Sequence, residues 1–134
     1  MYLVDTSVWI DFLRGTHTQA VSRLNQIIEA EIPFGITGVI YQEILQGAAS
    51  PAQFEQLRTY FSTQRFFDPR FEKYSYAAAA QLYFTCRQNG ITIRSTLDCL
   101  IAQICLEHGL ILLNSDKDFE RISTIQSDLR LESL

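Results

Sequence analysis

The sequence has few of the features that mark membrane proteins or proteins that bind polyanions. No apolar run approaches the roughly 20 residues of a bilayer-spanning helix, and Asp5 and Asp11 interrupt the apolar N-terminal segment. Basic residues number 11 against 15 acids, which gives a net charge of −4. The overall charge therefore does not favour a nucleic acid, and we expect a soluble, cytoplasmic protein without membrane association.

Cysteines and phosphate-binding loops are also scarce. The three cysteines, Cys86, Cys99 and Cys105, lack the spacing of a disulfide framework or a CxxC site. They lie among helix-favouring residues, which predicts reduced, buried side chains in a reducing compartment. His17 and His108 do not pair with a cysteine by any recognisable spacing. No GxGxxG or GxxxxGK[ST] loop occurs, so neither Cys–His catalysis nor these nucleotide-binding motifs are expected.

Length and hydrophobic content predict one compact domain over residues 1–134. The chain is 47% hydrophobic, which suffices for a single core. Short apolar runs alternate with helical periodicity, and this order favours an α/β fold: an α/β/α sandwich with a mostly parallel central sheet and right-handed crossovers. Strands are expected near Leu3, at 33–36, near Phe66 and at 110–113, and helices at 6–13, 19–30, 38–46, 51–61, 71–88, 96–107 and after Asp116.

Two aspartates follow predicted strands. Asp5 ends the apolar stretch "YLV", and Asp116 comes just after the apolar run at 110–113. In an open parallel sheet, ligands bind beyond the carboxyl ends of the strands. The two carboxylates could therefore meet at one edge of the sheet.

A third acid, Glu43, lies on the same face of its predicted helix as Val39 and Ile40. A carboxylate on an apolar stripe is costly unless it is paired. No Lys or Arg occurs between Arg23 and Arg58. We therefore expect its partner to come from elsewhere in the fold or to be a cation.

A fourth acid, Asp98, occupies the first turn of a predicted helix and could also face inward. Four gathered carboxylates would repel one another and raise one another's pKa values. Mg²⁺ or Mn²⁺ would remove this conflict, since both prefer oxygen ligands, and would activate water for phosphodiester hydrolysis. Setting these four aside leaves 11 acids against 11 bases, so a nucleic-acid substrate is not excluded.

Helix capping is the alternative role for the three aspartates. Asp5 and Asp116 each stand where a helix is predicted to begin, and Ser95 with Asp98 matches a capping box. For Glu43 the alternative is an ordinary position on a helix surface. Both interpretations stay open for each residue alone, but the four acids together favour a metal site.

Three stretches, "YLVDTSVWIDFLRG", "TGVIYQEILQG" and "STLDCLIAQICLEHGLILLNSDKDFERI", occur in this order between Tyr2 and about Ile122. Together they resemble a PIN-domain protein, in particular the VapC toxins of bacterial type II toxin–antitoxin systems. The resemblance implies a Rossmann-like PIN fold and a Mg²⁺- or Mn²⁺-dependent endoribonuclease that inhibits translation and growth. It also implies a cognate VapB-like antitoxin and a homodimer.

The resemblance assigns the catalytic, metal-binding acids to Asp5, Glu43, Asp98 and Asp116. Asp118, in the "DF" pair, is a second candidate for the fourth acid or for a supporting role around it. The sequence leaves open which of Asp116 and Asp118 is the fourth acid.

Further residues near the expected edge receive supporting roles. By resemblance, Ser7 could hold a water at the metal, and Asn114 stands where many relatives have Thr or Ser, which implies changed hydrogen bonds around the acids. Arg14, Arg94 and Lys117 are candidates for binding RNA phosphates, with ordinary solvated surface as their alternative. A structured RNA with a reachable loop, such as tRNA or rRNA, is the expected target.

Other functional classes are open to the same sequence. A solitary PIN nuclease in RNA processing would keep the acids but lack an antitoxin. A non-catalytic PIN-like module that binds RNA or protein would have no need of all four acids. A receiver-like signalling module also carries acids at strand ends, but it requires a Lys at a late strand end, where this chain has "NSD".

Overall fold

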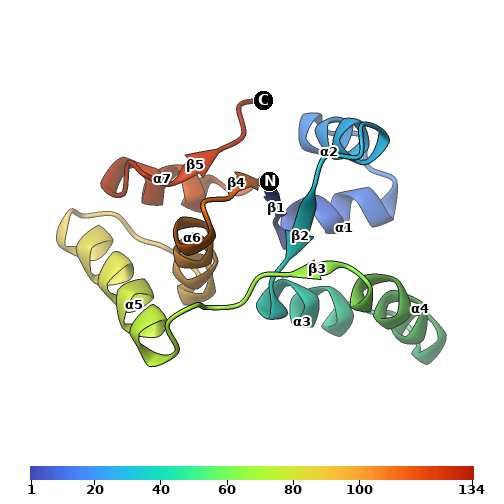
Figure 1. Cartoon of the computed structure of the whole chain (residues 1–134), viewed down its shortest axis with the longest axis horizontal. Helices are drawn as coiled ribbons and strands as arrows, with labels where there is room; N and C mark the ends of the chain where they lie inside the picture. Colours follow the sequence, from blue (N-terminus) through green and yellow to red (C-terminus); the bar gives the residue numbers. More distant parts are fainter.

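A parallel sheet of five short strands forms the centre of the structure, a computed structural model that describes residues 1–134 (Figure 1). The three inner strands are nearly continuous apolar runs, as expected where helices cover both faces of a sheet. The strands are β1 (Tyr2–Val4), β2 (Phe34–Ile36), β3 (Arg65–Phe66), β4 (Ile111–Leu113) and β5 (Arg130–Leu131).

The strand order is β3-β2-β1-β4-β5, and every neighbouring pair is parallel. The first strand is therefore the central one. Val4 of β1 is aligned with Leu113 of β4, and the amide of Asp5 donates a hydrogen bond of 3.0 Å to the Leu113 carbonyl. This register brings the residues that follow β1 and β4 to the same edge of the sheet.

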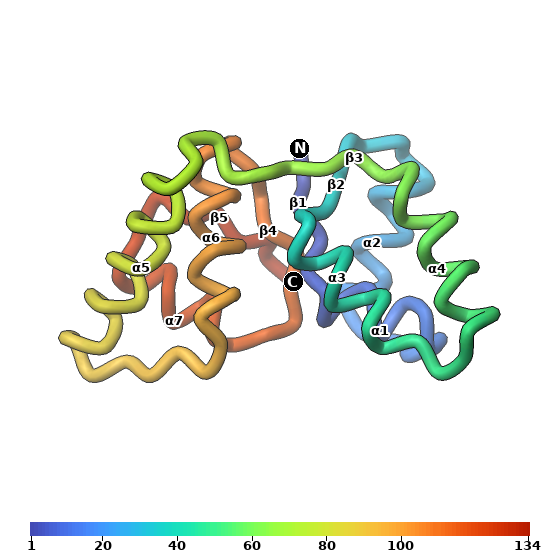
Figure 2. Tube along the Cα trace, turned by 90° about the horizontal axis from the view of Figure 1, so that it is seen from below, coloured from blue at the N-terminus to red at the C-terminus, as the bar shows by residue number.

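Seven helices surround the sheet. They are α1 (Thr6–Arg14), α2 (Gln19–Glu29), α3 (Gly38–Gln46), α4 (Pro51–Ser62), α5 (Lys73–Gln88), α6 (Thr96–His108) and α7 (Lys117–Ile125). Helices α1 to α4 lie on one side of the sheet, whereas α5 to α7 pack against one another on the other side (Figure 2). The predicted α/β/α sandwich with a parallel sheet is confirmed.

The core lies between the sheet and its helices. Trp9 of α1 is fully buried and packs edge-on against Phe61 of α4, with ring centroids 4.9 Å apart. Cys86, Cys99 and Cys105 are free and buried, which confirms the prediction that they are small core residues. None of the helices is long and apolar enough to cross a membrane.

The predicted elements match the structure to within one residue at their ends, with two larger differences. The helix predicted at 71–88 begins two residues later, at Lys73, because Glu72 has a positive φ of 52° that a helix does not accommodate. Strand β5 was not predicted, since two residues of mixed polarity carry no strand pattern of their own. It forms because its backbone pairs with the edge of β4.

Candidate metal and active site

The acidic residues gather at the carboxyl edge of the sheet because of the chain's topology. Asp5 follows β1, and Asp116 and Asp118 follow β4. Glu43 lies on α3, which begins directly after β2, and Asp98 lies in the first turn of α6. Helix α6 leads into β4 from the opposite direction, so its first turn also reaches the carboxyl edge.

Asp5 has a structural role at the start of α1 and lies near Glu43 and Asp98, whose charges interact with its own. It is 5% exposed and caps α1, because its Oδ2 accepts hydrogen bonds from the Ser7 amide at 3.2 Å and the Ser7 hydroxyl at 2.6 Å. Burial raises the pKa of Asp5, and repulsion from Glu43 adds to this rise, while the bonds from Ser7 oppose it. The capping interpretation is thus confirmed, yet Oδ1 accepts no hydrogen bond from the protein.

Glu43 has a hydrogen-bond partner, as expected for a carboxylate on an apolar face of a helix. It is half-buried, and its Oε1 accepts a hydrogen bond of 2.9 Å from the hydroxyl of Thr6, which is buried at the start of α1. The partner therefore comes from a distant part of the chain and is neutral. No ion pair joins this carboxylate to a basic residue.

Asp98 is the acid with the least support from the protein. Its half-buried carboxyl accepts no hydrogen bond. The N-cap of α6 is Ser95, whose hydroxyl accepts from the Leu97 amide at 3.3 Å, and Asp98 takes no part in the cap. Burial raises the pKa of Asp98 to about 7, and repulsion from Asp5 and the other acids contributes. The predicted capping box is therefore only half formed: Ser95 caps the helix, and both carboxyl oxygens of Asp98 remain available to a ligand.

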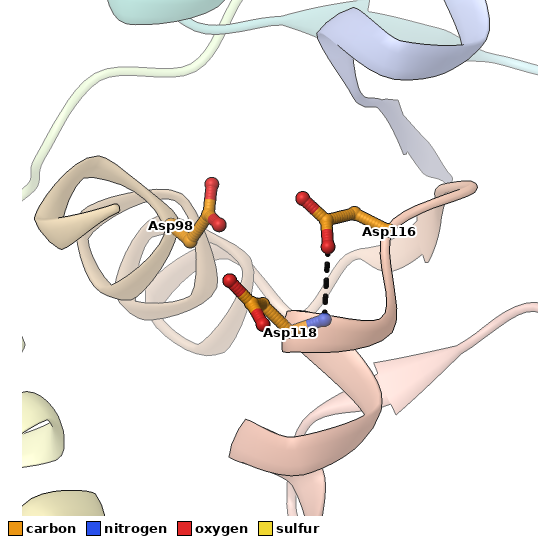
Figure 3. Close-up of side chains that lie close together, drawn as sticks. All are labelled: Asp98, Asp116 and Asp118. Carbon is orange, nitrogen blue, oxygen red and sulfur yellow. Dashed lines mark hydrogen bonds between the residues drawn. The ribbon is translucent and has the colours of Figure 1, made fainter. Parts of the chain in front are cut away.

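Asp98, Asp116 and Asp118 converge on one point (Figure 3). Each offers one carboxylate oxygen, and the three oxygens lie within 4.8 Å of one another. Oδ1 of Asp116 caps α7 by accepting from the Asp118 amide at 2.9 Å (Figure 3). The capping and clustering interpretations of Asp116 are again compatible.

Asp118 differs from the other acids because both its oxygens are occupied. Its side chain is 1% exposed. Oδ2 accepts from the Arg94 amide at 3.0 Å and from Arg94 Nε at 3.4 Å, while Oδ1 accepts from Arg121 Nη1 at 2.6 Å. Burial alone would raise the pKa of Asp118, but these bonds outweigh burial and hold it below its usual value. Asp118 therefore remains charged as part of a buried ion-pair network.

Arg94 links the two aspartates that follow β4. Its Nη2 donates to Oδ1 of Asp116 at 3.1 Å, while its Nε and amide bind Asp118. Hydrogen bonding to Asp118 and attraction to both acids raise the pKa of Arg94. Its side chain is nevertheless 72% exposed, so the guanidinium lies at the rim of the cluster rather than inside it.

The remaining predicted residues lie at different places around the edge. Ser7 accepts a hydrogen bond of 3.2 Å from the Ser115 amide and so joins the ends of β1 and β4. Asn114 accepts from the Asp116 amide at 3.2 Å and shapes that turn. Lys117 is exposed at the start of α7. Arg14 is exposed at the end of α1, where no hydrogen bond or ion pair joins it to the acids.

The donor set fits Mg²⁺ or Mn²⁺. Asp98 has no donor at its carboxyl, Asp5 has an unbonded Oδ1, and the contacts shown for Asp116 involve only Oδ1. These free oxygens are hard ligands, and repulsion among the acids would be relieved by a divalent cation. Asp118 fits this role less well, because its oxygens are already bound to two guanidinium groups.

Comparison with known proteins identifies the family. Residues 2–125 match the PIN domain family. A VapC ribonuclease of Mycobacterium bovis and ribonuclease VapC11 of Mycobacterium tuberculosis are each 30% identical to this chain over 131 residues, covering 93% of both chains. The chain therefore belongs to the PIN-domain family. Within that family, these relatives are VapC ribonucleases.

Solved structures share the same fold. VapBC2 from Rickettsia felis, bound to a fragment of promoter DNA, gives a TM-score of 0.74 at 19% identity and covers 99% of this chain and 98% of the other. VapBC-1 from nontypeable Haemophilus influenzae gives a TM-score of 0.73 at 18% identity, with coverage of 98% and 96%. At these identities the likeness establishes the fold alone.

Two residues of the site were not predicted from the sequence. Arg121 contacts Asp118 from the next turn of α7, and its i, i+3 spacing on a predicted helix was a usable signal. Thr6 binds Glu43 across a separation of 37 residues. No local pattern could have indicated this second contact, because it depends on how α1 packs against α3.

Proposed function

We propose that this protein is a metal-dependent endoribonuclease, the toxin of a type II toxin–antitoxin pair. Asp98, Asp116 and Asp118 converge on one point, and Asp5 and Glu43 are near enough to raise the pKa of Asp98 by repulsion; this arrangement carries the proposal. The ribonuclease names of the relatives support it. Inhibition of translation and growth by cleavage of a structured RNA, such as tRNA or rRNA, is the expected outcome.

Asp5, Asp98 and Asp116 are the residues that would hold Mg²⁺ or Mn²⁺, with Glu43 binding directly or through water. When bound, such an ion lowers the pKa of water and neutralises charge on phosphate oxygens. Ser7 fixes one oxygen of Asp5 and leaves the other free. Thr6 fixes Glu43 in the same way. The free oxygens are therefore oriented before any ligand arrives.

Asp116 is the better candidate for the fourth acid. The oxygens of Asp118 already accept hydrogen bonds from Arg94 and Arg121. Because the Asp118 carboxylate is buried, breaking these ion pairs so that it could bind a metal would be costly. The contacts of Asp116 involve one oxygen. We assign Asp118 a supporting role and Asp116 a ligand role.

We propose a VapB-like antitoxin and a second copy of this chain as protein partners. Several fold neighbours are VapBC proteins, which supports the first partner. Arg94 and Lys117 lie beside the acids and are proposed to contact RNA phosphates. We propose the same role for Arg14, which is exposed at the end of α1 and forms no hydrogen bond or ion pair with the acids.

The decisive experiment measures cleavage of a labelled RNA pool that includes tRNA and rRNA, with Mn²⁺ and with EDTA. Asp5→Asn should abolish cleavage, since it removes a ligand charge. Asp128→Asn, which changes an exposed aspartate after α7, should leave cleavage intact. Cleavage of equal rate in Asp5→Asn would contradict the proposal.

Three further outcomes discriminate the alternatives. RNA retention without cleavage at any Mn²⁺ concentration would favour a non-catalytic binding module. Cleavage by a protein whose neighbouring genes encode no inhibitor would favour a solitary processing nuclease. Formation of an inactive complex with the product of an adjacent reading frame would support the toxin assignment.

A further inference from the structure

We propose that a basic pocket beside the acidic cluster binds one phosphate group of the nucleic-acid substrate, adjacent to the phosphate that is cleaved. The pocket has a volume of about 460 Å³. This inference rests on the proposed function for its substrate class. The residues that line the pocket are Ser7, Arg94, Ser115, Asp116, Lys117 and Arg121.

The composition of the pocket favours an anion. Its lining contains three cationic side chains, a single carboxylate and no hydrophobic residue. The lining residues therefore carry more positive than negative charge, although the chain as a whole has a net charge of −4 and Asp118 behind the pocket pairs with two of the cations. The pocket also lies at the start of α7, where the helix dipole favours negative charge.

Asp118 holds two of the three cations in place. It binds Arg94 through Oδ2 and Arg121 through Oδ1, and it is itself 1% exposed. The side chains of Arg94 and Arg121 are 72% and 48% exposed. Each guanidinium is therefore anchored at one edge and open to solvent at the other.

Such anchoring prepares both side chains for phosphate. Arg121 uses Nη1 for Asp118, so its Nη2 hydrogens have no partner in the protein. Arg94 uses Nε and Nη2, which leaves Nη1 free. A planar guanidinium with free N–H groups can form bidentate hydrogen bonds to phosphate oxygens. Because the rotamers are already fixed, less conformational entropy is lost on binding.

The place of the pocket determines which phosphate it would take. Asp116 belongs both to the pocket lining and to the acidic cluster. A phosphate in the pocket is consequently next to the reacting centre and not at it. Asp118 then acts as a positioning residue, since it touches the two arginines and not the substrate.

Phosphate binding can be tested without activity. Inorganic phosphate is titrated into the full chain in EDTA, and the arginine Nε–H signals are followed by NMR. We expect the signals of Arg94 and Arg121 to shift together. Arg121→Gln should weaken binding roughly tenfold, as for the loss of one charge-assisted hydrogen bond, and Arg121→Lys should restore part of it.

Arg58→Gln is the matched control, because Arg58 forms an i, i+3 ion pair with Glu55 on α4, as Arg121 does with Asp118 on α7. It should leave phosphate binding unchanged. Lys117→Gln should also weaken phosphate binding. Because Lys117 is exposed and does not bind Asp118, this substitution leaves the buried ion pairs intact. Absence of shifts at Arg94 and Arg121 would overturn the inference. So would phosphate affinities in the Lys117→Gln and Arg121→Gln variants that equal the affinity of the wild type.

A second experiment identifies the phosphate. In an RNA cleaved at one position, each phosphate in turn is replaced by a neutral methylphosphonate on a 2′-deoxy sugar, with a 2′-deoxy phosphate as reference. One position beside the cleaved bond should show a KM raised about tenfold in the wild type and little change in Arg121→Gln. An equal penalty in both proteins would overturn the inference while leaving the nuclease assignment intact. Phosphate binding without any RNA cleavage would instead overturn the proposed function alone.

Discussion

Thr6 and Glu43 are joined by a hydrogen bond of 2.9 Å, although 37 residues separate them in the sequence. Thr6 is the first residue of α1 and Glu43 lies midway along α3. The bond therefore connects the residue that follows Asp5 with an acid from a different helix. It orients the Glu43 carboxylate with a neutral partner.

Thr6→Val removes this hydroxyl while keeping a β-branched side chain of similar size. Loss of a contact that orients a metal-binding residue typically costs 10- to 100-fold in metal affinity or activity, and we expect a decrease of about tenfold in Mn²⁺ affinity, measured by isothermal titration calorimetry. Thr6→Ser, which retains the hydroxyl, should stay within about twofold of the wild type. Equal affinities for all three proteins would show that the bond does not orient Glu43.

Asp98→Asn should stabilise the metal-free protein above neutral pH. The pKa of Asp98 is about 7 in the folded chain against an ordinary value of 3.8. Between these values the native state binds more protons than the unfolded state, so the free energy of unfolding falls as pH rises from about 4 to about 7. Asparagine does not ionise, so the free energy of unfolding of Asp98→Asn should exceed that of the wild type by about 1–2 kcal/mol at pH 8, after allowance for solvent screening.

The measurement is urea unfolding of both proteins in EDTA at pH 4.5 and pH 8. Asp128→Asn, at an exposed position, serves as the control and should leave the pH profile unchanged. Parallel profiles for the wild type and Asp98→Asn would contradict the prediction.

Mn²⁺ should raise the thermal stability of the protein more at pH 8 than at pH 6. Metal binding requires ionised carboxyls, and the pKa of Asp98 near 7 means that it must first lose a proton at the lower pH. At a hundredfold excess over Kd, a bound ligand adds about 2.7 kcal/mol to the free energy of unfolding. Differential scanning calorimetry should show this gain in the wild type and not in Asp5→Asn. A gain that is the same at both pH values would exclude Asp98 from the site.

Gly35→Ala should destabilise the sheet at its β2–β3 pair. A Cβ at this position would lie 2.5 Å from the Arg65 carbonyl oxygen and 2.6 Å from the Phe67 ring. Overpacking of this kind costs about 1–3 kcal/mol. Gly38→Ala is the control, because nothing lies within 4 Å of the added methyl at the start of α3; it should be neutral or stabilising by about 0.5 kcal/mol. Thermal unfolding distinguishes the two, and similar melting temperatures would contradict the prediction.

Much of this structure could be predicted from the sequence because its signals are local. Apolar runs bounded by turn residues located four of the five strands, and the parallel order placed Asp5 and Asp116 at one edge. Capping patterns were equally readable, since Asp5 and Asp116 do cap α1 and α7. For Asp116, the structure shows that capping coexists with a place in the group formed with Asp98 and Asp118.

The contacts that could not be predicted depend on packing between distant segments. Arg94 was expected to face solvent or phosphate, but its amide and side chain bind Asp118 because the segment before α6 passes beside the first turn of α7. Likewise, a sequence with Asp116 and Asp118 two residues apart does not reveal which carboxyl is enclosed. That distinction arises only when Arg121 and Arg94 are both in position.

The central place of β1 has a consequence for biosynthesis. Asp5 and Glu43 are translated early, whereas Asp98, Asp116 and the β4 strand that pairs with β1 emerge from the ribosome only near the end of synthesis. A nascent chain thus carries two of the four proposed metal ligands, Asp5 and Glu43, for most of its elongation. The centre is completed only when the last quarter of the polypeptide folds onto the first, so the protein has little capacity to act before it is released.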